Sequence, residues 1–415
     1  MKVLVIGLSG VTAELLFGDE RLENLHRLME AGCYGRLQGI VPPDSVPGWM
    51  CMATSQDPGS LGVYGTWERV DRSYAPPRAV TSRSFEEMTI WDQFAAAGRP
   101  SVLVGVAPCF PPQKIYGVSV GWDSSLDTRG GIFTHPPFIA EELRALFGGD
   151  CTMADRRFEA IRHLLRNTDW GYFHVVENCT EHKAQADGCA YLDGQIGTLL
   201  ECLDDETAVC VVSESGSQAA EGTFAMTQWL RDQGYMSLVN QPSKHSDWET
   251  IDWRGTRVWA LPCGDTPQLF FNVRGREPQG VVEPADCELL RNELVARLGA
   301  LDDSGSGPTC AAYRPDEIYR SLRGVAPELI VDCLSRPRAE GAWILASSNN
   351  PLCGEIEGAS LLDVAPTLLE LAGHEIPGSM QGRSLVAGLA GREQRPSAAS
   401  DEEQIRQRLS GLGYI

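Results

Sequence analysis

The sequence predicts an α/β protein with a doubly wound, mostly parallel sheet, helices on both faces of that sheet, and an inserted cap region. Two patterns favour this class. Short apolar runs of strand length alternate along the chain with segments whose apolar residues recur at helical spacing. Several of these runs end in Gly or Ser, as parallel strands do where their carboxyl ends open onto a ligand site. The 415 residues, 43% of them hydrophobic, suffice for one large domain with insertions or for two lobes.

The chain begins with a predicted βαβ unit. Residues 2–7 form a continuous apolar run, which is typical of a central parallel strand, and Ser9 lies where that strand opens. A helix is expected over residues 22–31, because leucines recur every three residues there and Gly32 follows. Residues 34–40 alternate like a second strand.

Residues 41–55 are the stretch that points most directly to chemistry. Prolines on both sides of Ser45 restrict the backbone, and a helix-compatible segment follows at once. The start of a helix presents unpaired N–H groups and a partial positive charge, which favours an anionic group beside a nucleophile. Ser45 is therefore the candidate catalytic nucleophile for phosphoryl or sulfuryl transfer. The alternative is that Ser45 only caps the helix.

A helix at residues 88–97 and a strand at 101–106 continue the pattern, which then stops. Residues 109–150 contain four prolines and a Gly-Gly pair, with one short helix. An irregular stretch of this length inside an α/β chain is more typical of an inserted cap than of a linker. We therefore expect 109–150 to be the cap region, and residues 1–108 together with 151–415 to form the α/β core.

The rest of the chain resumes the alternation of helices and strands. Helices are predicted at residues 155–166, 191–203, 226–234, 287–298, 361–371 and 401–412, and strands at 171–177, 207–213, 258–261, 269–273, 328–331 and 342–346.

Composition narrows the range of partners. The formal charge of −21 argues against nucleic acid and against anionic membranes. The chain opens on a buried-strand pattern rather than a signal peptide, and no run reaches membrane-spanning length, so a cytoplasmic location is expected. The 13 cysteines are scattered without CxxC spacing, often between apolar residues, which predicts reduced buried thiols rather than disulfides or a zinc site.

Four segments stand out by their order and spacing. They are Val-Ile-Gly-Leu-Ser-Gly at 5–10, Pro-Asp-Ser-Val-Pro-Gly-Trp-Met-Cys-Met-Ala-Thr at 43–54, Val-Ser-Glu-Ser-Gly at 212–216, and Asp-Val-Ala-Pro-Thr-Leu-Leu-Glu-Leu-Ala-Gly at 363–373. Together with Asn-Val-Arg-Gly-Arg-Glu-Pro-Gln-Gly-Val at 272–281, they resemble the type I phosphodiesterase/nucleotide pyrophosphatase branch of the alkaline phosphatase superfamily. This resemblance covers nearly the whole chain and implies an alkaline-phosphatase-like fold.

The resemblance implies a serine or threonine nucleophile between two divalent metals, with Ser45 at the nucleophile position. This sequence differs from the family at all six ligand positions, which fall on Ser9, Glu181, Gln185, Glu214, Ser215 and near Pro337. Because no imidazole remains among them, and an Asp-to-Glu change moves a carboxylate by about 1 Å or more, the two-zinc site is not expected. No cofactor is therefore predicted. The alternative is a single Mg²⁺ or Mn²⁺ on Glu181 and Glu214, with His182 as a substitute ligand.

The resemblance also indicates where a small anionic substrate would bind. Tyr64, Trp67 and His135 come from the segments that shape the pocket in this family, and Ser9 lies at the strand opening. Lys183, Arg336 and Arg338 are candidates for neutralising the substrate without a metal. The alternatives are core packing for the aromatic residues and solvated loops for the basic ones.

Three functions are consistent with these observations. The first is an enzyme that uses Ser45 to hydrolyse or transfer a group from a small phosphate or sulfate ester, nucleotide-like or otherwise, with few or no metals, as in a tailoring step of specialised metabolism. The second is a catalytically inactive ligand-binding or regulatory protein. The third is a pocket turned to other chemistry. Turnover by Ser45→Ala and ligand binding without turnover distinguish the first two.

Overall fold

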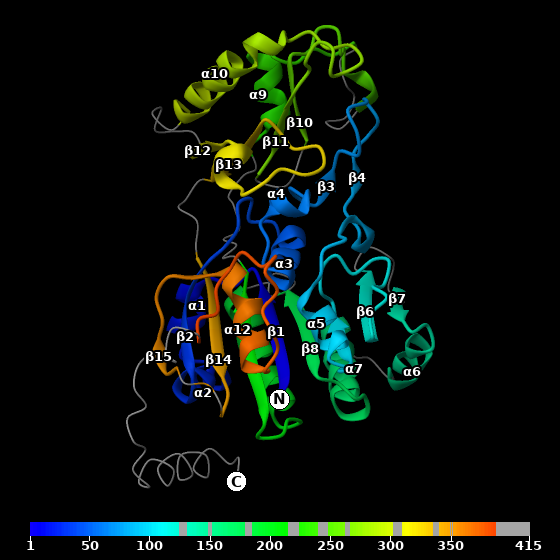
Figure 1. Ribbon diagram of the computed structural model, residues 1–415, viewed down its shortest axis with the longest axis vertical. Coiled ribbons are helices and arrows are strands. Elements are labelled where there is room, and N and C mark those ends of the chain that lie inside the picture. Colours follow the sequence, from blue (N-terminus) through cyan, green and yellow to red (C-terminus); the bar gives the residue numbers. More distant parts are fainter. Residues whose placement is uncertain are drawn as a thin grey trace.

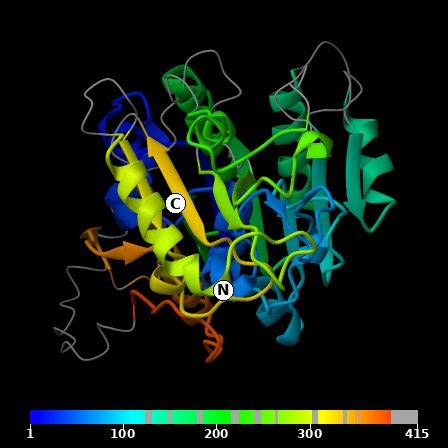
Figure 2. The same ribbon diagram turned by 90° about the horizontal axis from the view of Figure 1, so that it is seen from above.

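A computed structural model describes residues 1–123, 131–147, 152–178, 185–214, 224–239, 248–261, 266–301, 309–334, 340–348, 350 and 352–386. Within these residues the chain forms a large sheet domain and a smaller domain stacked on it, with the small domain at the top of Figure 1. The view from above shows the small domain lying over the large sheet (Figure 2).

The large sheet has the strand order β15-β2-β14-β9-β1-β8-β5-β6-β7, with β16 also pairing with β2. Its centre is β1 (Lys2–Ser9), parallel to both β8 (Tyr172–Asn178) and β9 (Thr207–Ser213). The other strands are β2 (Cys33–Gln38), β5 (Ser101–Val104), β6 (Gly117–Asp123), β7 (Gly131–His135), β14 (Gly341–Ala346), β15 (Gly354–Glu355) and β16 (Ala359–Ser360). Only β14 and β7 run antiparallel to their neighbours, so the predicted mostly parallel sheet is confirmed.

Helices cover both faces of this sheet because the side chains of β1 alternate between two apolar clusters. Leu4 and Ile6 pack on one face and Val3 and Val5 on the other. The first face carries α1 (Ala13–Gly18), α2 (Glu23–Ala31), α6 (Ile139–Leu146), α7 (Met153–Asn167) and α8 (Gln185–Leu200), and the second carries α3 (Ser45–Thr54), α5 (Ile90–Ala96) and α12 (Val364–Leu371).

The prediction that residues 109–150 form an inserted cap is wrong. Strands β6 and β7 extend the large sheet at its edge, and Leu143 of α6 packs into the core of the first face. Their pattern is weak because glycine and serine interrupt the apolar residues of β6, and because edge strand β7 is buried only at alternate positions. Gly117 begins β6 at φ +135°, and a Cβ there would lie 1.9 Å from the carbonyl oxygen of Ser101, so the strand starts where only glycine fits.

The real second unit lies within the range that the sequence assigned to one continuous core. Its four-stranded antiparallel sheet has the order β10 (Val258–Leu261), β11 (Gln268–Phe271), β13 (Leu329–Leu334) and β12 (Thr309–Tyr313). Helices α9 (Met226–Asp232) and α10 (Cys287–Gly299) pack against this sheet. Cys310 and Cys333 face each other across β12 and β13 and form a disulfide, so the prediction of reduced thiols is wrong for this pair.

Short elements join the two domains. They are α4 (Pro58–Leu61), the hairpin of β3 (Trp67–Glu68) and β4 (Arg78–Ala79), and α11 (Pro315–Ile318). In Figure 1 the hairpin lies beside the small domain, directly after the helices that follow residue 45. Among the described residues, none of the helices has the length and apolar character needed to cross a bilayer.

Candidate active site

Ser45 is the first residue of α3 and is half-buried at the carboxyl edge of the large sheet. The residue that caps this helix is Asp44, whose carboxylate accepts a hydrogen bond from the Val46 N–H at 3.0 Å. The alternative reading of Ser45 as the cap is therefore wrong. Its hydroxyl is left available for another partner.

That partner is Glu214, the residue directly after β9. Ser45 Oγ donates to Glu214 Oε1 at 2.6 Å, and Ser9 Oγ donates to the same oxygen at 2.9 Å. Trp49 Nε1 in turn donates to Ser9 Oγ at 3.2 Å. The second carboxylate oxygen, Oε2, is buried and has no hydrogen-bond partner among the described residues.

Sheet register brings these residues together. Gly7 of β1 is level with Val212 of β9. The residues that follow these two parallel strands therefore lie close together at the carboxyl ends of the strands. Trp49 is fully buried between this edge and α3, and a Cβ at Gly7 would lie 2.5 Å from its ring. The absence of a side chain at Gly7 thus leaves room for the Trp49 ring, whose Nε1 donates to Ser9.

Burial raises the pKa of Glu214 to about 7. The hydrogen bonds from Ser45 and Ser9 act in the opposite direction, and the nearby charge of Asp44 raises the pKa further. A carboxylate with this pKa is ionised in part of the molecules at neutral pH and can accept the proton of a bound hydroxyl. The Ser45–Glu214 pair therefore has the geometry and protonation state of a nucleophile with its general base.

The start of α3 is a poorer anion site than the sequence predicts. Pro47 has no N–H, and the Val46 N–H is bonded to Asp44, which leaves the Ser45 N–H at the first turn. The two carboxyl residues beside Ser45, its chain neighbour Asp44 and its hydrogen-bond partner Glu214, are both acidic. Stabilisation of an anionic group must therefore come from other parts of the chain.

The structure separates the predicted substrate contacts. Trp67 is 42% exposed and follows Thr66, which is bonded to Asp44, and its role as a substrate contact stays a prediction. Tyr64 is instead buried against Tyr319, and its hydroxyl donates to the Arg323 carbonyl at 2.8 Å. The structure therefore gives Tyr64 a packing role.

His135 is also remote from Ser45. It lies on edge strand β7, four strands from β1, which corresponds to about 20 Å across the sheet. Its register partner is Ser119, level with the middle of the central strands rather than with their carboxyl ends. The prediction that His135 lines the site is wrong because β7 was not recognised as a strand.

Several candidates fall outside the described residues. These are Glu181, His182, Lys183, Ser215, Arg336, Pro337 and Arg338. Gln185 begins α8, and nothing is described of its side chain. Their proposed roles stay predictions.

The described donor set does not fit a pair of divalent cations. Around Glu214 it consists of one carboxylate and the neutral hydroxyls of Ser9 and Ser45, whereas zinc sites use three or four His, Cys or carboxylate ligands. In the part of the chain that the structure describes, there is no group of three or more His, Cys, Asp or Glu side chains able to hold a metal. The carboxylate of Asp44 is already occupied by Val46 and Thr66.

Sequence reasoning missed the two residues that complete the site. Glu214 was considered only as a metal ligand, and Asp44 was not considered. A signal for Asp44 was present, because Asp directly before a helical run is a strong N-cap pattern. The role of Glu214 as the partner of Ser45 had no local signal, because the two residues are 169 positions apart.

Solved structures with the same fold are phosphoesterase-like proteins. Human ectonucleotide pyrophosphatase/phosphodiesterase 5 shares 11% identity at a TM-score of 0.60, over 94% of this chain and 98% of that chain. An inactive variant of the murine protein in complex with AMP shares 11% identity at a TM-score of 0.57, over 91% of this chain and 96% of that chain. A mutant of alkaline phosphatase PafA shares 13% identity at a TM-score of 0.60, over 92% of this chain and 98% of that chain. A search of curated proteins found no match.

The fold is therefore that of the alkaline phosphatase superfamily, as predicted. The profile of the type I phosphodiesterase / nucleotide pyrophosphatase family matches residues 3–357. The chain belongs to this family, and membership supports a phosphate-ester hydrolase-like function. Metal ions are usual in the family, whereas the described part of this chain holds no group of three or more metal-binding side chains.

Proposed function

We propose that the protein hydrolyses, or transfers a group from, a small phosphate or sulfate ester, with Ser45 as nucleophile and Glu214 as general base in place of the metal pair. The observation that carries this proposal is the 2.6 Å hydrogen bond from Ser45 Oγ to a buried carboxylate whose pKa is raised to about 7.

The reaction has two steps. Ser45 Oγ attacks phosphorus or sulfur, the bond to the leaving oxygen breaks, and the serine proton passes to Glu214 Oε1. Glu214 then donates this proton to the leaving group. In the second step a water, or an acceptor alcohol, loses its proton to Glu214 and attacks the phosphorus or sulfur of the covalent ester. The bond to Ser45 Oγ breaks, and Glu214 returns the proton to this oxygen. Ser9 and Trp49 hold the carboxylate in place throughout.

Charge favours some substrates over others. The side chains of Asp44 and Glu214 beside Ser45 are acidic, so a diester or sulfate ester with one negative charge suits the site better than a dianionic monoester. Lys183, Arg336 and Arg338 are the proposed counter-charges for such a substrate. A neighbour of the same fold holds AMP, which makes nucleotide esters the first compounds to test.

The test is turnover by the wild type and by Ser45→Ala across a panel of nucleotide, phosphodiester, phosphomonoester and sulfate esters. We expect hydrolysis of at least one class and a loss of at least about 10³-fold in Ser45→Ala. Mass spectrometry of the acid-quenched reaction should find the covalent ester on the peptide containing Ser45. Equal turnover by Ser45→Ala would remove this hydroxyl from the mechanism.

A second candidate is a ligand-binding protein without turnover. The observation that favours it is the start of α3, where Pro47 and Asp44 leave few N–H groups for an anionic transition state. Tight binding of a nucleotide or its sulfate analogue in a thermal-shift measurement, with no turnover of any ester in the panel, would select this candidate.

A further inference from the structure

Residues 62–80 contact both domains of the protein. Tyr64 donates from its hydroxyl to the Arg323 carbonyl, and its own carbonyl accepts from Gln268 Nε2 of β11 at 2.9 Å. Two residues further on, Thr66 turns back to the large domain and bonds to Asp44. Arg69 then enters the small domain. Figure 1 shows the hairpin of this segment, β3 and β4, between the two units.

Thr66 holds the residue that precedes the proposed nucleophile. Its N–H donates to Asp44 Oδ2 at 2.8 Å, and its hydroxyl lies 2.9 Å from Oδ1 and 2.8 Å from Oδ2. The same carboxylate accepts from the Val46 N–H. The Asp44 carboxylate is thus fixed on one side by the helix that Ser45 begins and on the other side by residue 66.

Arg69, three positions after Thr66, holds the same segment in the small domain. Its side chain is 4% exposed, and its guanidinium lies 5.1 Å from the ring centroid of Trp259 and 5.4 Å from that of Phe270. Its Nη1 is 3.3 Å from Glu277 Oε1, and the side chain of Glu277 is fully buried. A buried guanidinium with one carboxylate partner is costly to displace, so Arg69 fixes the segment in the small domain.

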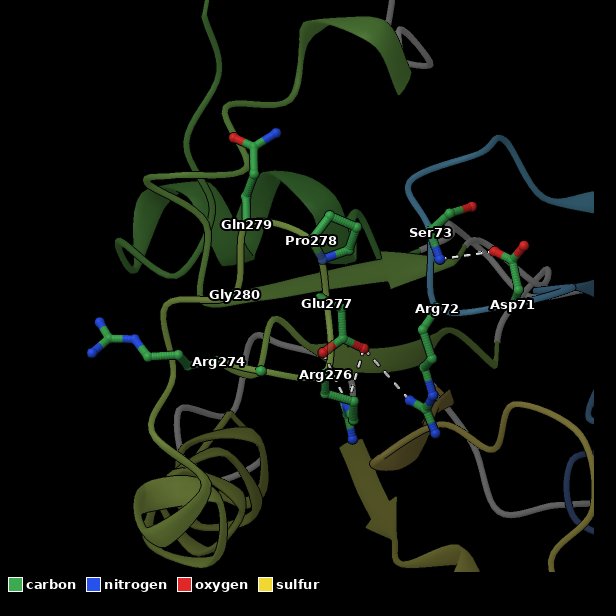
Figure 3. Close-up of a pocket in the computed structure, with 10 residues that line it drawn as sticks. Asp71, Arg72, Ser73, Arg274, Arg276, Glu277, Pro278, Gln279 and Gly280 are labelled. Carbon is green, nitrogen blue, oxygen red and sulfur yellow. Dashed lines mark hydrogen bonds and ion pairs between the residues drawn. The ribbon is translucent and has the colours of Figure 1, made fainter.

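Arg72 also contacts Glu277, and Glu328 besides, but more loosely than Arg276 does. Its Nη1 lies 3.6 Å from Glu277 and 4.0 Å from Glu328, whereas the corresponding Arg276 distances are 2.9 and 2.7 Å. Figure 3 shows Arg72 and Arg276 converging on Glu277 in the wall of a cavity of about 500 Å³. Because the Arg72 side chain is 35% exposed to this cavity, it offers a matched control for Arg69.

We propose that Thr66 is a positioning residue for Ser45, acting through Asp44, and that the small domain sets this position by holding Arg69. The proposal rests on the proposed function. Only two residues separate Thr66 from Arg69, and three Cα–Cα steps span at most about 11 Å. A shift of the small domain is therefore transmitted to Asp44 through a short segment of chain. A change in the direction of the Ser45 hydroxyl alters its alignment for attack, to which reaction rates are sensitive.

The experiment measures the reactivity of Ser45 directly, with an alkyl fluorophosphonate as probe. Ser45 Oγ attacks phosphorus, the P–F bond breaks with loss of fluoride, and the serine proton passes to Glu214. The rate of labelling of the Ser45 peptide is followed by mass spectrometry from pH 5 to 9. The variants are Thr66→Val, Thr66→Ser, Arg69→Gln and Arg72→Gln, with Thr168→Val as a control whose hydroxyl bonds only to the Leu164 carbonyl.

We expect Thr66→Val to be labelled at least about tenfold more slowly at high pH, with the pH midpoint and melting temperature unchanged. Thr66→Ser and Thr168→Val should match the wild type, and Arg69→Gln should be slower than Arg72→Gln. If Thr66→Val does not fold, Thr66→Ala replaces it, because the backbone bond to Asp44 remains.

Three outcomes separate this inference from the proposed function. A wild type labelled on Ser45 at the same rate as Thr66→Val overturns the positioning role and leaves Ser45 as the nucleophile. Equal rates in Arg69→Gln and Arg72→Gln overturn the part assigned to the small domain. A wild type that is not labelled on Ser45 overturns the proposed function, and the positioning role with it.

Discussion

The hydroxyl of Ser45 and the carboxylate of Glu214 are joined by a 2.6 Å hydrogen bond at the carboxyl edge of the large sheet. Members of the family to which this chain belongs normally use metal ions, and the proposed function assigns the activation of Ser45 to this carboxylate instead. The role proposed for this pair predicts how activity depends on pH, on the neighbouring hydroxyl of Ser9 and on metals.

Activity should depend on the ionisation of Glu214. Because a general base acts only when deprotonated and the pKa of Glu214 is about 7, log kcat/KM should rise with unit slope up to about pH 7 and then level off. Glu214→Gln should lower the plateau by about 10²-fold or more and abolish this limb. A pH–rate profile with the same limb in both proteins would show that another group titrates.

Deprotonation of Glu214 should lower the free energy of unfolding as the pH rises. The folded protein holds the proton of Glu214 up to about pH 7, whereas the unfolded chain releases it near 4.5, so the folded state binds more protons between these values. The contribution is fully present below about pH 4.5 and is lost as the pH passes 7, amounting to about 3 kcal/mol. The free energy of unfolding of Glu214→Gln, relative to the wild type, should increase by this amount from pH 4.5 to 7.5. Urea titrations across that range measure it, and a constant difference would contradict it.

The hydroxyl of Ser9 should lower the pKa of Glu214. Its hydrogen bond to Oε1 favours the ionised carboxylate, so Ser9→Ala should raise the pKa of Glu214 and move the acidic limb of the pH–rate profile to higher pH. Ser213→Ala is the matched control, because the Ser213 hydroxyl lies at the end of the neighbouring strand β9 but donates to the Val11 carbonyl. An identical shift in both variants would assign the effect to packing.

Removal of metals should leave activity in place. Since the carboxylate that would bind a cation instead accepts two serine hydroxyls, dialysis against EDTA should reduce turnover by less than about twofold. Metal analysis of the same samples provides the control. Two stoichiometric zinc ions, with activity restored only by their return, would mean that residues outside the described ranges complete a metal site.

The small domain should depend on its disulfide. Cys310 and Cys333 are 23 positions apart, and closing a loop of this length stabilises a protein by about 3 kcal/mol. The double variant Cys310→Ala/Cys333→Ala should lose about this much in urea unfolding, and alkylation without reductant should leave both thiols of the wild type unmodified. Cys287→Ala, at a free half-buried cysteine of the same domain, is the control. Full alkylation of the native protein would refute the disulfide.

Much of the large domain was predictable because its strands are buried on both faces. Residues 2–7 and 207–213 read as strands from their apolar runs, and the structure has β1 and β9 there. The edge strand β7 gave no such signal, which is why His135 was misplaced and residues 109–150 were read as a cap. The antiparallel sheet of the small domain was missed for a related reason, because isolated short strands do not reveal which sheet they join.

The sequence by itself determined the family and the alternation of strands and helices around β1, and it singled out Ser45 as the candidate nucleophile. It did so because burial pattern and proline placement are local properties of the chain. Only the tertiary structure decided the partner of that serine. Ser45 and Ser9 lie 169 and 205 positions from Glu214, and their meeting depends on the register of β1 against β9, which local periodicity does not encode.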